Sequence, residues 1–493
     1  MDTLLGIDLG TTGIKAAICS PDGRLLGESY LEYPLLRPAP GVVEQDAAAW
    51  WTLSQEAIRQ AVQAAGVDGH TVRALSTSSQ GISFVAVDQE GRPLDRAINW
   101  LDTRATAQAA AISSRYPDAD LFALTGKRPS PAYVLPKLLW LRQHKPDLYR
   151  QAYKFLMAHD YLVYRLTGQA VTDHSMAGGT LLYDINRLRW SQELLTAFDI
   201  AEEQLPTIQW AGTSLGPIRS QAADALGLSR ETIVAVGGQD QKCAALGASI
   251  RPGVATISLG TASAISCLTE RPVLDPERRI PVFPFVVPGY WDLEGVVGTA
   301  GGALRWLRET LFPGQSYADL GRMAQESPPG ANGVCFYPHL SGANSPHWQL
   351  DVWGAFTGLS LATGSADIVR SVFEGVAFQI QENLDVLDEM GLAVEALTLF
   401  GGGAQNPFWV QMISDIAAKP ATATEMVDVA NWGACLLAGI GAGVLEGDIW
   451  DLSRGQQGGS PSAPRPDQVE RYRDIYARYR AQEGQLMVAG EKA

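Results

Sequence analysis

The first segment whose residue types could do chemistry is residues 8–15, with the sequence DLGTTGIK. Its glycines let backbone N–H groups approach an anion closely, and consecutive N–H groups with the Thr11 and Thr12 hydroxyls can form an anion-binding nest. Asp8 would repel a phosphate, so its carboxylate is expected to hold Mg²⁺, through water. Lys15 would neutralise charge on the phosphate. The alternative is a tight hairpin in which Asp8 caps the turn and Lys15 is solvated.

A second carboxylate, Asp240, follows residues 237–239, GGQ, where a strand is expected to give way to a helix. A carboxylate at a helix N-terminus stays ionised. It can accept a proton late in phosphoryl transfer, because that reaction depends on positioning more than on a strong base. The same position also suits an aspartate that only caps the helix. The local sequence therefore leaves both a catalytic base and an N-cap open.

The hairpin segment has a counterpart in the second half of the chain. Residues 7–14, IDLGTTGI, are echoed by residues 257–264, ISLGTASA, in which Gly260 and Thr261 repeat the turn and Ser258 stands in place of Asp8. Each copy predicts strand, turn, strand. The repeat therefore predicts two similar halves that face one nucleotide.

Each half also contains a strand that ends in glycines before a helix, at residues 233–238 and 397–403. In the second of these, GGGAQNP at residues 401–407 could hold adenosine or phosphate, although a tight packing turn also explains a glycine run. The boundary between the halves is expected near residues 245–256.

Regular elements are expected to position these groups. Strands at 4–10, 14–19 and 24–30, joined by tight turns, predict antiparallel hairpins, whereas a dinucleotide-binding fold would open with strand, loop and helix. Apolar spacing predicts a helix over 46–65, capped by Asp46 and ended by Gly66. The other expected elements are strands at 72–77 and 83–87, a mainly helical region at 103–230, a buried helix at 434–445, a surface loop at 454–466 and a C-terminal helix at 467–482.

Composition limits the class of protein. The chain has 493 residues, 46% apolar and 18% charged, which predicts a globular protein of about two to four domains. A net charge of −15 argues against a nucleic-acid partner. The five cysteines are scattered, so neither a disulfide framework nor a zinc site is expected. The sequence shows no signal peptide and no apolar stretch long enough to span a bilayer, which predicts a cytoplasmic protein with no membrane partner.

The order and spacing of several sequence blocks resemble the FGGY carbohydrate kinases, of the actin/hexokinase-like ATPase superfamily, and among them most closely the xylulokinases. The blocks that carry the resemblance are residues 6–15, 43–46, 50–51, 100–104, 136–141, 159–162, 166–168, 258–261, 337–342, 374–378 and 401–404.

The resemblance implies an α/β fold of two ribonuclease H-like domains, residues 1–247 and 248–493, with ATP and Mg²⁺ in the cleft between them. It implies ATP-dependent phosphorylation of a sugar hydroxyl, with a ketopentose such as D-xylulose as substrate, and a possible homodimer. The alternatives are a kinase for another ketose, a polyol or a sugar acid, a non-catalytic sugar-sensing regulator, and a chaperone or filament protein on the same fold.

The resemblance also assigns roles to individual residues. Asp240 would be the general base and Asp8 would lie near the metal. The ATP-binding residues would be Thr11, Thr12, Lys15, Gly260, Thr261, Gly301, Gly402, Gly403 and Asn406. The sugar would be bound by Gln80, Gly81, Ile82, Trp100, Asp102 and Asp240. Packing and an interstrand cap are the alternative roles of Trp100 and Asp102.

The sugar side departs from the pattern of the family. Xylulokinases usually have Gln-Met-His-Gly where this chain has Gln80, Gly81, Ile82 and Ser83. Glycerol kinases have an Arg-Glu pair at the positions of Gly81 and Ile82. Residues 342–346, GANSP, also differ from the usual Gly-Glu-Arg-x-Pro. A site that loses hydrogen-bonding partners loses discrimination against analogues, so a larger pocket or a different substrate is open.

Overall fold

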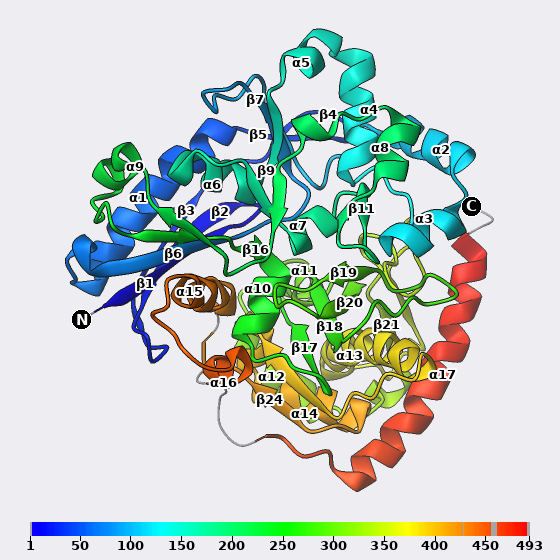
Figure 1. The fold of residues 1–493 in the computed structure, drawn as a ribbon. Helices are drawn as coiled ribbons and strands as arrows, with labels where there is room; N and C mark the ends of the chain where they lie inside the picture. The colour runs from blue at the N-terminus through cyan, green and yellow to red at the C-terminus, as the bar shows by residue number, and fades with distance from the viewer. Residues whose placement is uncertain (1, 427, 455–460, 491–493) are drawn as a thin grey trace.

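The computed structural model describes residues 2–426, 428–454 and 461–490. It has two halves, each built on a twisted sheet (Figure 1). The first sheet has the strand order β14-β15-β6-β1-β2-β3, with β16 beside β6. Its strands are β1 (Thr3–Leu9), β2 (Gly13–Cys19), β3 (Leu25–Glu32), β6 (Val72–Ser79), β14 (Ser214–Pro217), β15 (Ile233–Ala235) and β16 (Gly238–Gln239).

The second sheet has the order β19-β20-β18-β17-β23-β24. Its strands are β17 (Val254–Ser258), β18 (Ser263–Thr269), β19 (Val282–Pro284), β20 (Trp291–Val297), β23 (Ala396–Phe400) and β24 (Ala421–Ala423).

The two sheets share one topology. β1 pairs antiparallel with β2 and parallel with β6, and β17 pairs antiparallel with β18 and parallel with β23. A further antiparallel strand follows the hairpin in each half, β3 in the first and β20 in the second. The repeat at residues 7–14 and 257–264 is therefore a repeat of structure, and the prediction of two similar α/β halves is confirmed.

Helices cover the outer faces of the sheets. α1 (Ala47–Ala65) begins after Asp46, whose side chain accepts a hydrogen bond from Ala48 N (2.9 Å), and ends at Gly66 in the left-handed conformation, as predicted. In the second half α13 (Ser365–Glu389) and α14 (Pro407–Ala417) pack together. The long C-terminal helix α17 (Pro466–Gly490) runs along the outside of this half (Figure 1), and extends beyond the predicted helix at 467–482.

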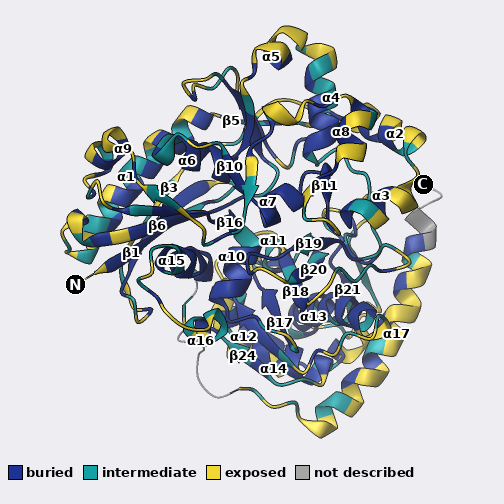
Figure 2. Ribbon diagram, viewed as in Figure 1, coloured by how far each residue is buried: buried dark blue, intermediate teal, exposed yellow. Residues whose placement is uncertain are grey.

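Two helices lie between the sheets. α10 (Asp240–Gly247) belongs to the first half, and α15 (Val429–Gly441) follows β24 of the second half but packs against α10, β1 and β6. Both are almost wholly buried (Figure 2). The helices approach closely at glycines, since a Cβ on Gly433 would lie 2.0 Å from the backbone oxygen of Cys243. The helix predicted at 434–445 is thus buried as expected, although it begins and ends earlier.

A third sheet, of order β4-β5-β8-β7-β9, lies over one end of the first half. Its strands are β4 (Leu36–Ala39), β5 (Val42–Gln45), β7 (Phe84–Val87), β8 (Ala97–Ile98) and β9 (Lys154–Met157). The region predicted as mainly helical contains eight α-helices, but six short strands interrupt them. Most of the predicted loop at 454–466 lies outside the described residues.

The other helices are α2 (Thr106–Arg115), α3 (Asp118–Thr125), α4 (Val134–His144), α5 (Pro146–Gln151), α6 (Ala158–Thr167), α7 (His174–Gly178), α8 (Gln192–Phe198), α9 (Ser220–Leu226), α11 (Gly301–Thr310), α12 (Tyr317–Glu326) and α16 (Ile449–Ser453). The other strands are β10 (Val171–Asp173), β11 (Tyr183–Asp184), β12 (Arg189–Trp190), β13 (Thr207–Gln209), β21 (Cys335–Tyr337) and β22 (Ala355–Thr357). None of the helices in the described ranges is long and apolar enough to cross a membrane.

Candidate active site

A cavity of about 520 Å³ lies between the two halves and is lined by residues from both. The structure brings together nine of the residues that the sequence singled out. These are Asp8, Thr11, Gln80, Gly81, Ile82, Trp100 and Asp240 from the first half and Gly260 and Thr261 from the second. The two Gly-Thr hairpins therefore meet at one cavity.

Asp240 is the first residue of α10, at the point where β16 ends beside the last residues of β6. The cap of this helix is Gln239, whose side chain accepts a hydrogen bond from Lys242 N (3.2 Å). The interpretation of Asp240 as a plain N-cap is therefore wrong. Its Oδ1 accepts a hydrogen bond from Gln241 N (2.7 Å), and the residue lines the cavity.

Burial raises the pKa of Asp240 to about 8, and the negative charge of Asp8 adds to the rise. This outcome differs from the expectation of an ionised carboxylate, because loss of hydration and a like charge outweigh the helix N-terminus. Burial and the charge of Asp428 likewise raise the pKa of Asp8, to about 6, although Ser78 Oγ donates a hydrogen bond to its Oδ1 (2.7 Å). The charge on Asp8 therefore makes the ionisation of Asp240 less favourable.

The carboxyl group of Asp8 supplies oxygen atoms of the kind that bind a magnesium ion. Mg²⁺ prefers oxygen ligands, and a divalent cation would compensate the repulsion between Asp8 and its neighbours. Asp8 on β1 is paired with Lys15 on β2 in the first hairpin. Both Asp8 and Asp428 line the cavity. Asp8 would hold the ion, as the sequence predicts.

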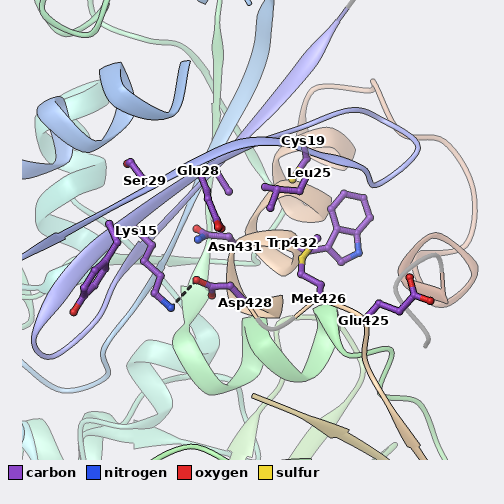
Figure 3. Close-up of a pocket in the computed structure, with 12 residues that line it drawn as sticks. Lys15, Cys19, Leu25, Glu28, Ser29, Glu425, Met426, Asp428, Asn431 and Trp432 are labelled. Carbon is purple, nitrogen blue, oxygen red and sulfur yellow. Dashed lines mark ion pairs between the residues drawn. The ribbon is translucent and has the colours of Figure 1, made fainter. Parts of the chain in front are cut away.

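Lys15 and Thr12 do not line this cavity. The Lys15 ammonium lies 2.6 Å from Asp428 Oδ2 and faces a second cavity, of about 690 Å³, beside β2 and β3. Figure 3 shows the two side chains pointing toward each other, with Asp428 just before α15. Because Asp428 lines both cavities, this ion pair forms part of the wall between them.

All the predicted sugar-binding residues except Asp102 line the cavity. The indole N–H of Trp100 donates to Thr11 Oγ1 (2.8 Å) and links the sugar side to the first hairpin. Gln80 is fixed, because its side chain donates to Gln45 Oε1 (2.9 Å) and accepts from Asn99 (3.0 Å). Asp102 does not line the cavity.

Asp102 is fully buried elsewhere in the first half. Its carboxylate accepts hydrogen bonds from Val43 N (2.6 Å) and from the Arg104 guanidinium. These contacts fit the interstrand cap that the sequence left open.

The backbone at Ile82 is strained. Its φ is +52°, a left-handed conformation that β-branched residues rarely adopt and that costs on the order of 1–3 kcal/mol. The apolar side chain nevertheless lines the cavity, and it crowds Gly179, where an added Cβ would lie 2.8 Å from Ile82 Cγ2. Neither Gly81 nor Ile82 offers a polar side-chain group to the cavity.

In the second half, the four other predicted nucleotide-binding residues, Gly301, Gly402, Gly403 and Asn406, do not line the cavity. Gly301 N donates to Gly260 O (2.8 Å), and a Cβ there would lie 2.5 Å from that oxygen. Gly403 is crowded by Trp409, whereas an added Cβ on Gly402 would meet no atom within 4 Å. Asn406 caps α14. Packing thus accounts for glycine at two of these positions, and the nucleotide role of all four stays a prediction.

Sequence reasoning missed several residues that line the cavity. These are Tyr133, Ser175, Phe283, Glu294 and Asp428, among others. Another missed residue is Arg305 on α11, whose guanidinium donates to Thr261 Oγ1 (3.3 Å) beside the second turn. No local motif marks them, because each reaches the cavity only through the pairing of distant strands and helices.

A duplicated α/β fold, with a Gly-Thr hairpin from each half and two buried carboxyl groups at the cavity between them, fits a protein that binds a nucleotide between its halves and transfers a phosphoryl group. The comparisons with known proteins then give the family. Residues 3–247 match the N-terminal domain, and residues 255–442 the C-terminal domain, of the FGGY family of carbohydrate kinases. The chain belongs to this family and is a sugar kinase that uses ATP.

Individual relatives support the same assignment. The chain is 30% identical to a xylulose kinase of Bacillus subtilis (strain 168) over 481 residues, 97% of this chain and 96% of the relative. The fold is similar to a ligand-bound xylulose kinase from Lactobacillus acidophilus (TM-score 0.94, 27% identity, all of both chains). It is also similar to a gluconate kinase from the same organism (TM-score 0.93, 27% identity, 100% of this chain and 99% of that one).

Proposed function

We propose that this protein transfers the γ-phosphoryl group of ATP to a primary hydroxyl of a ketopentose, and that the substrate is D-xylulose. The observation that carries the proposal is that Asp240 lines a cavity shared with Asp8 and with the Gly260-Thr261 turn. The similarity over nearly the whole chain to proteins named xylulose kinase supports the choice of sugar.

In its ionised form, Asp240 orients the sugar hydroxyl and accepts its proton as the bond to phosphorus forms. The group needs only to be well placed, since phosphoryl transfer passes through a loose transition state. Asp8 would hold Mg²⁺, which would supply positive charge to the phosphate oxygens. Backbone N–H groups of the two hairpins and the Thr261 hydroxyl stabilise those oxygens further, and Trp100 keeps the Thr11 hydroxyl in place.

A second candidate is a sugar acid. It is supported by the similarity of the fold to the protein named gluconate kinase. Gly81 and Ile82 line the cavity where the xylulokinase pattern has larger or polar groups, which leaves room for an acceptor other than D-xylulose. The two candidates predict different activities with MgATP.

The test is ADP release with MgATP and each of D-xylulose, D-ribulose, D-gluconate, xylitol and glycerol. We expect a selective response to D-xylulose. A higher kcat/KM for D-gluconate would replace the substrate and keep the mechanism, whereas ATP binding without turnover of any acceptor would contradict the proposed function.

We also infer a cytoplasmic homodimer that requires Mg²⁺, with the chain divided at residues 247/248. Light scattering of the purified protein tests the dimer. Titration of the activity with EDTA and Mg²⁺ tests the metal, and cell fractionation tests the location.

A further inference from the structure

The ionisable acidic and basic side chains described as lining the cavity are all acidic. Four carboxylates line it, those of Asp8, Asp240, Glu294 and Asp428. The described residues that line it include no lysine, arginine or histidine. Asp428 is neutralised by Lys15, and Asp8 is the expected magnesium ligand. The acceptor end, beside Asp240, is therefore bordered by the second half's Glu294, whose negative charge contributes to the raised pKa of Asp240.

The carboxylate of Glu294 is held by a buried lysine. Lys242 lies in the first turn of α10, two residues after Asp240, and is fully buried. Its ammonium contacts Glu294 Oε2 and lies 2.8 Å from Asp292 Oδ2. Asp292 and Glu294 are two residues apart on β20, so their side chains lie on the same face of the strand. Lys242 thus joins the first half to the second and is fully engaged by two carboxylates.

A second buried lysine, Lys127, is also unavailable to an anion. Lys127 lies, like Lys242, over the ring of Phe283, 3.8 Å from its centroid. Its Nζ donates to Val282 O (2.8 Å) and to Thr125 O (3.2 Å). Burial, together with the positive charge of Lys242, holds the pKa of Lys127 well below its usual range. It adds no fixed positive charge at the acceptor end.

We propose that Glu294, held in place by Lys242, is a specificity-determining residue that admits uncharged polyhydroxy acceptors to this cavity and excludes sugar acids. The inference rests on the proposed function, because it concerns the acceptor of the same site. A sugar carboxylate beside Asp240 would meet the net negative charge of Glu294 and Asp292, which share the single cation Lys242, in a medium of low effective dielectric. It would also lose its hydration without gaining a positive partner. Hydroxyl groups, in contrast, donate hydrogen bonds to carboxylates.

The experiment compares two probes of the same carbon skeleton, xylitol and D-xylonate, by isothermal titration calorimetry in the presence of MgADP. The wild-type protein is expected to bind xylitol at least about tenfold more tightly than D-xylonate. Glu294→Gln removes the charge and keeps the shape, and leaves Lys242 paired with Asp292. It is expected to reduce the preference for xylitol by about tenfold or more, which is about 1.4 kcal/mol.

Two control variants separate charge from other effects. Glu294→Asp keeps the charge and should keep the preference for xylitol. Glu277→Gln removes a carboxylate at an exposed position of the same half, 73% exposed and 3.7 Å from Arg279, and should leave the preference unchanged.

Equal or tighter binding of D-xylonate by the wild-type protein would overturn the inference without any variant. An unchanged preference in Glu294→Gln, or binding of neither probe, would also overturn it. Turnover of D-xylulose is a separate measurement. A protein that prefers xylitol to D-xylonate but does not phosphorylate D-xylulose would contradict the proposed substrate and leave this inference standing.

Discussion

The raised pKa of Asp240 means that this residue lowers the stability of the folded protein above about pH 4. Its pKa is raised from 3.8 to about 8, first by burial and then by the charge of Asp8. Between these two values the unfolded chain releases the proton while the folded chain retains it. The unfolded state therefore binds fewer protons, and the contribution of Asp240 to the free energy of unfolding falls as the pH rises from about 4 to about 8.

Asp240→Asn should therefore be more stable than the wild type at pH 8. The expected gain is about 1–3 kcal/mol in the free energy of unfolding. It should be small near pH 4 and vanish at lower pH, where the wild-type carboxyl is protonated in both states. Urea unfolding in magnesium-free buffer at pH 4, 6 and 8 measures it. A gain that is the same at all three values would contradict the electrostatic cause.

The same substitution should lower kcat by on the order of 10²–10⁴, the range for loss of a general base. Steady-state kinetics with MgATP and the best acceptor measure the change. Because the variant is expected to be more stable, the loss of activity cannot come from unfolding. A purified Asp240→Asn protein with wild-type kcat would contradict the role of this residue.

At the residue scale, the sequence identified the groups that belong to short motifs. Asp8, Thr11, Asp240, Gly260 and Thr261 stand in or beside glycine-rich turns, and the structure brings them to one cavity. Glu294 and Lys242 could not be found in this way. Their contact depends on the pairing of β20 within one half and on the position of α10 in the other, and neither residue has a local signature.

At the scale of elements, the crossing of α10 and α15 depends on glycine. A Cβ on Gly433 of α15 would lie 2.0 Å from the backbone oxygen of Cys243 in α10, and one on Gly247 would lie 2.0 Å from the oxygen of Val429. Both clashes involve backbone rather than flexible side chains. The two helices can therefore relieve them only by moving apart.

Gly433→Ala is expected to destabilise the protein by about 1–3 kcal/mol, the cost of overpacking a filled interior. The matched control is Gly484→Ala in α17, where an added Cβ meets no atom within 4 Å. It should instead stabilise the protein by about 0.5–1 kcal/mol, since alanine is the better helix former. Thermal unfolding of both variants gives the comparison, and equal effects would show that the helix crossing is not tight.

The elements that the sequence predicted well are those with strong periodicity and clear caps. The 46–65 helix has an apolar face, Asp46 before it and Gly66 after it, and α1 follows this pattern. Strands such as β11 (Tyr183–Asp184) and β12 (Arg189–Trp190) have two residues each, too few to show alternation. They form because each pairs with the other through backbone hydrogen bonds. The local sequence of such a short segment does not show which segment it will pair with.

At the scale of the whole molecule, the two halves are joined by a helix of the second half, α15, that packs into the first half. The repeat predicted the two similar halves, and the shared topology of their sheets confirms it. The crossing of α15 could not be predicted, because its apolar composition indicates only burial. Apolar residues of α15, among them Leu436 and Leu437, form one buried cluster with Leu4 of β1 and Ala74 of β6. The first sheet thus depends on a helix from the second half.

A fragment of residues 1–247 should therefore fail to fold stably, even though it contains the whole first sheet. Without α15 the face of β1 and β6 is exposed, and an uncovered apolar sheet face favours aggregation. Joining residues 428–445 to this fragment through a flexible Gly/Ser linker restores the covering helix and should restore a cooperative unfolding transition. Circular dichroism and urea unfolding of both fragments beside the full chain test this. Cooperative unfolding of residues 1–247 alone would show that each half folds independently and that α15 serves only to join them.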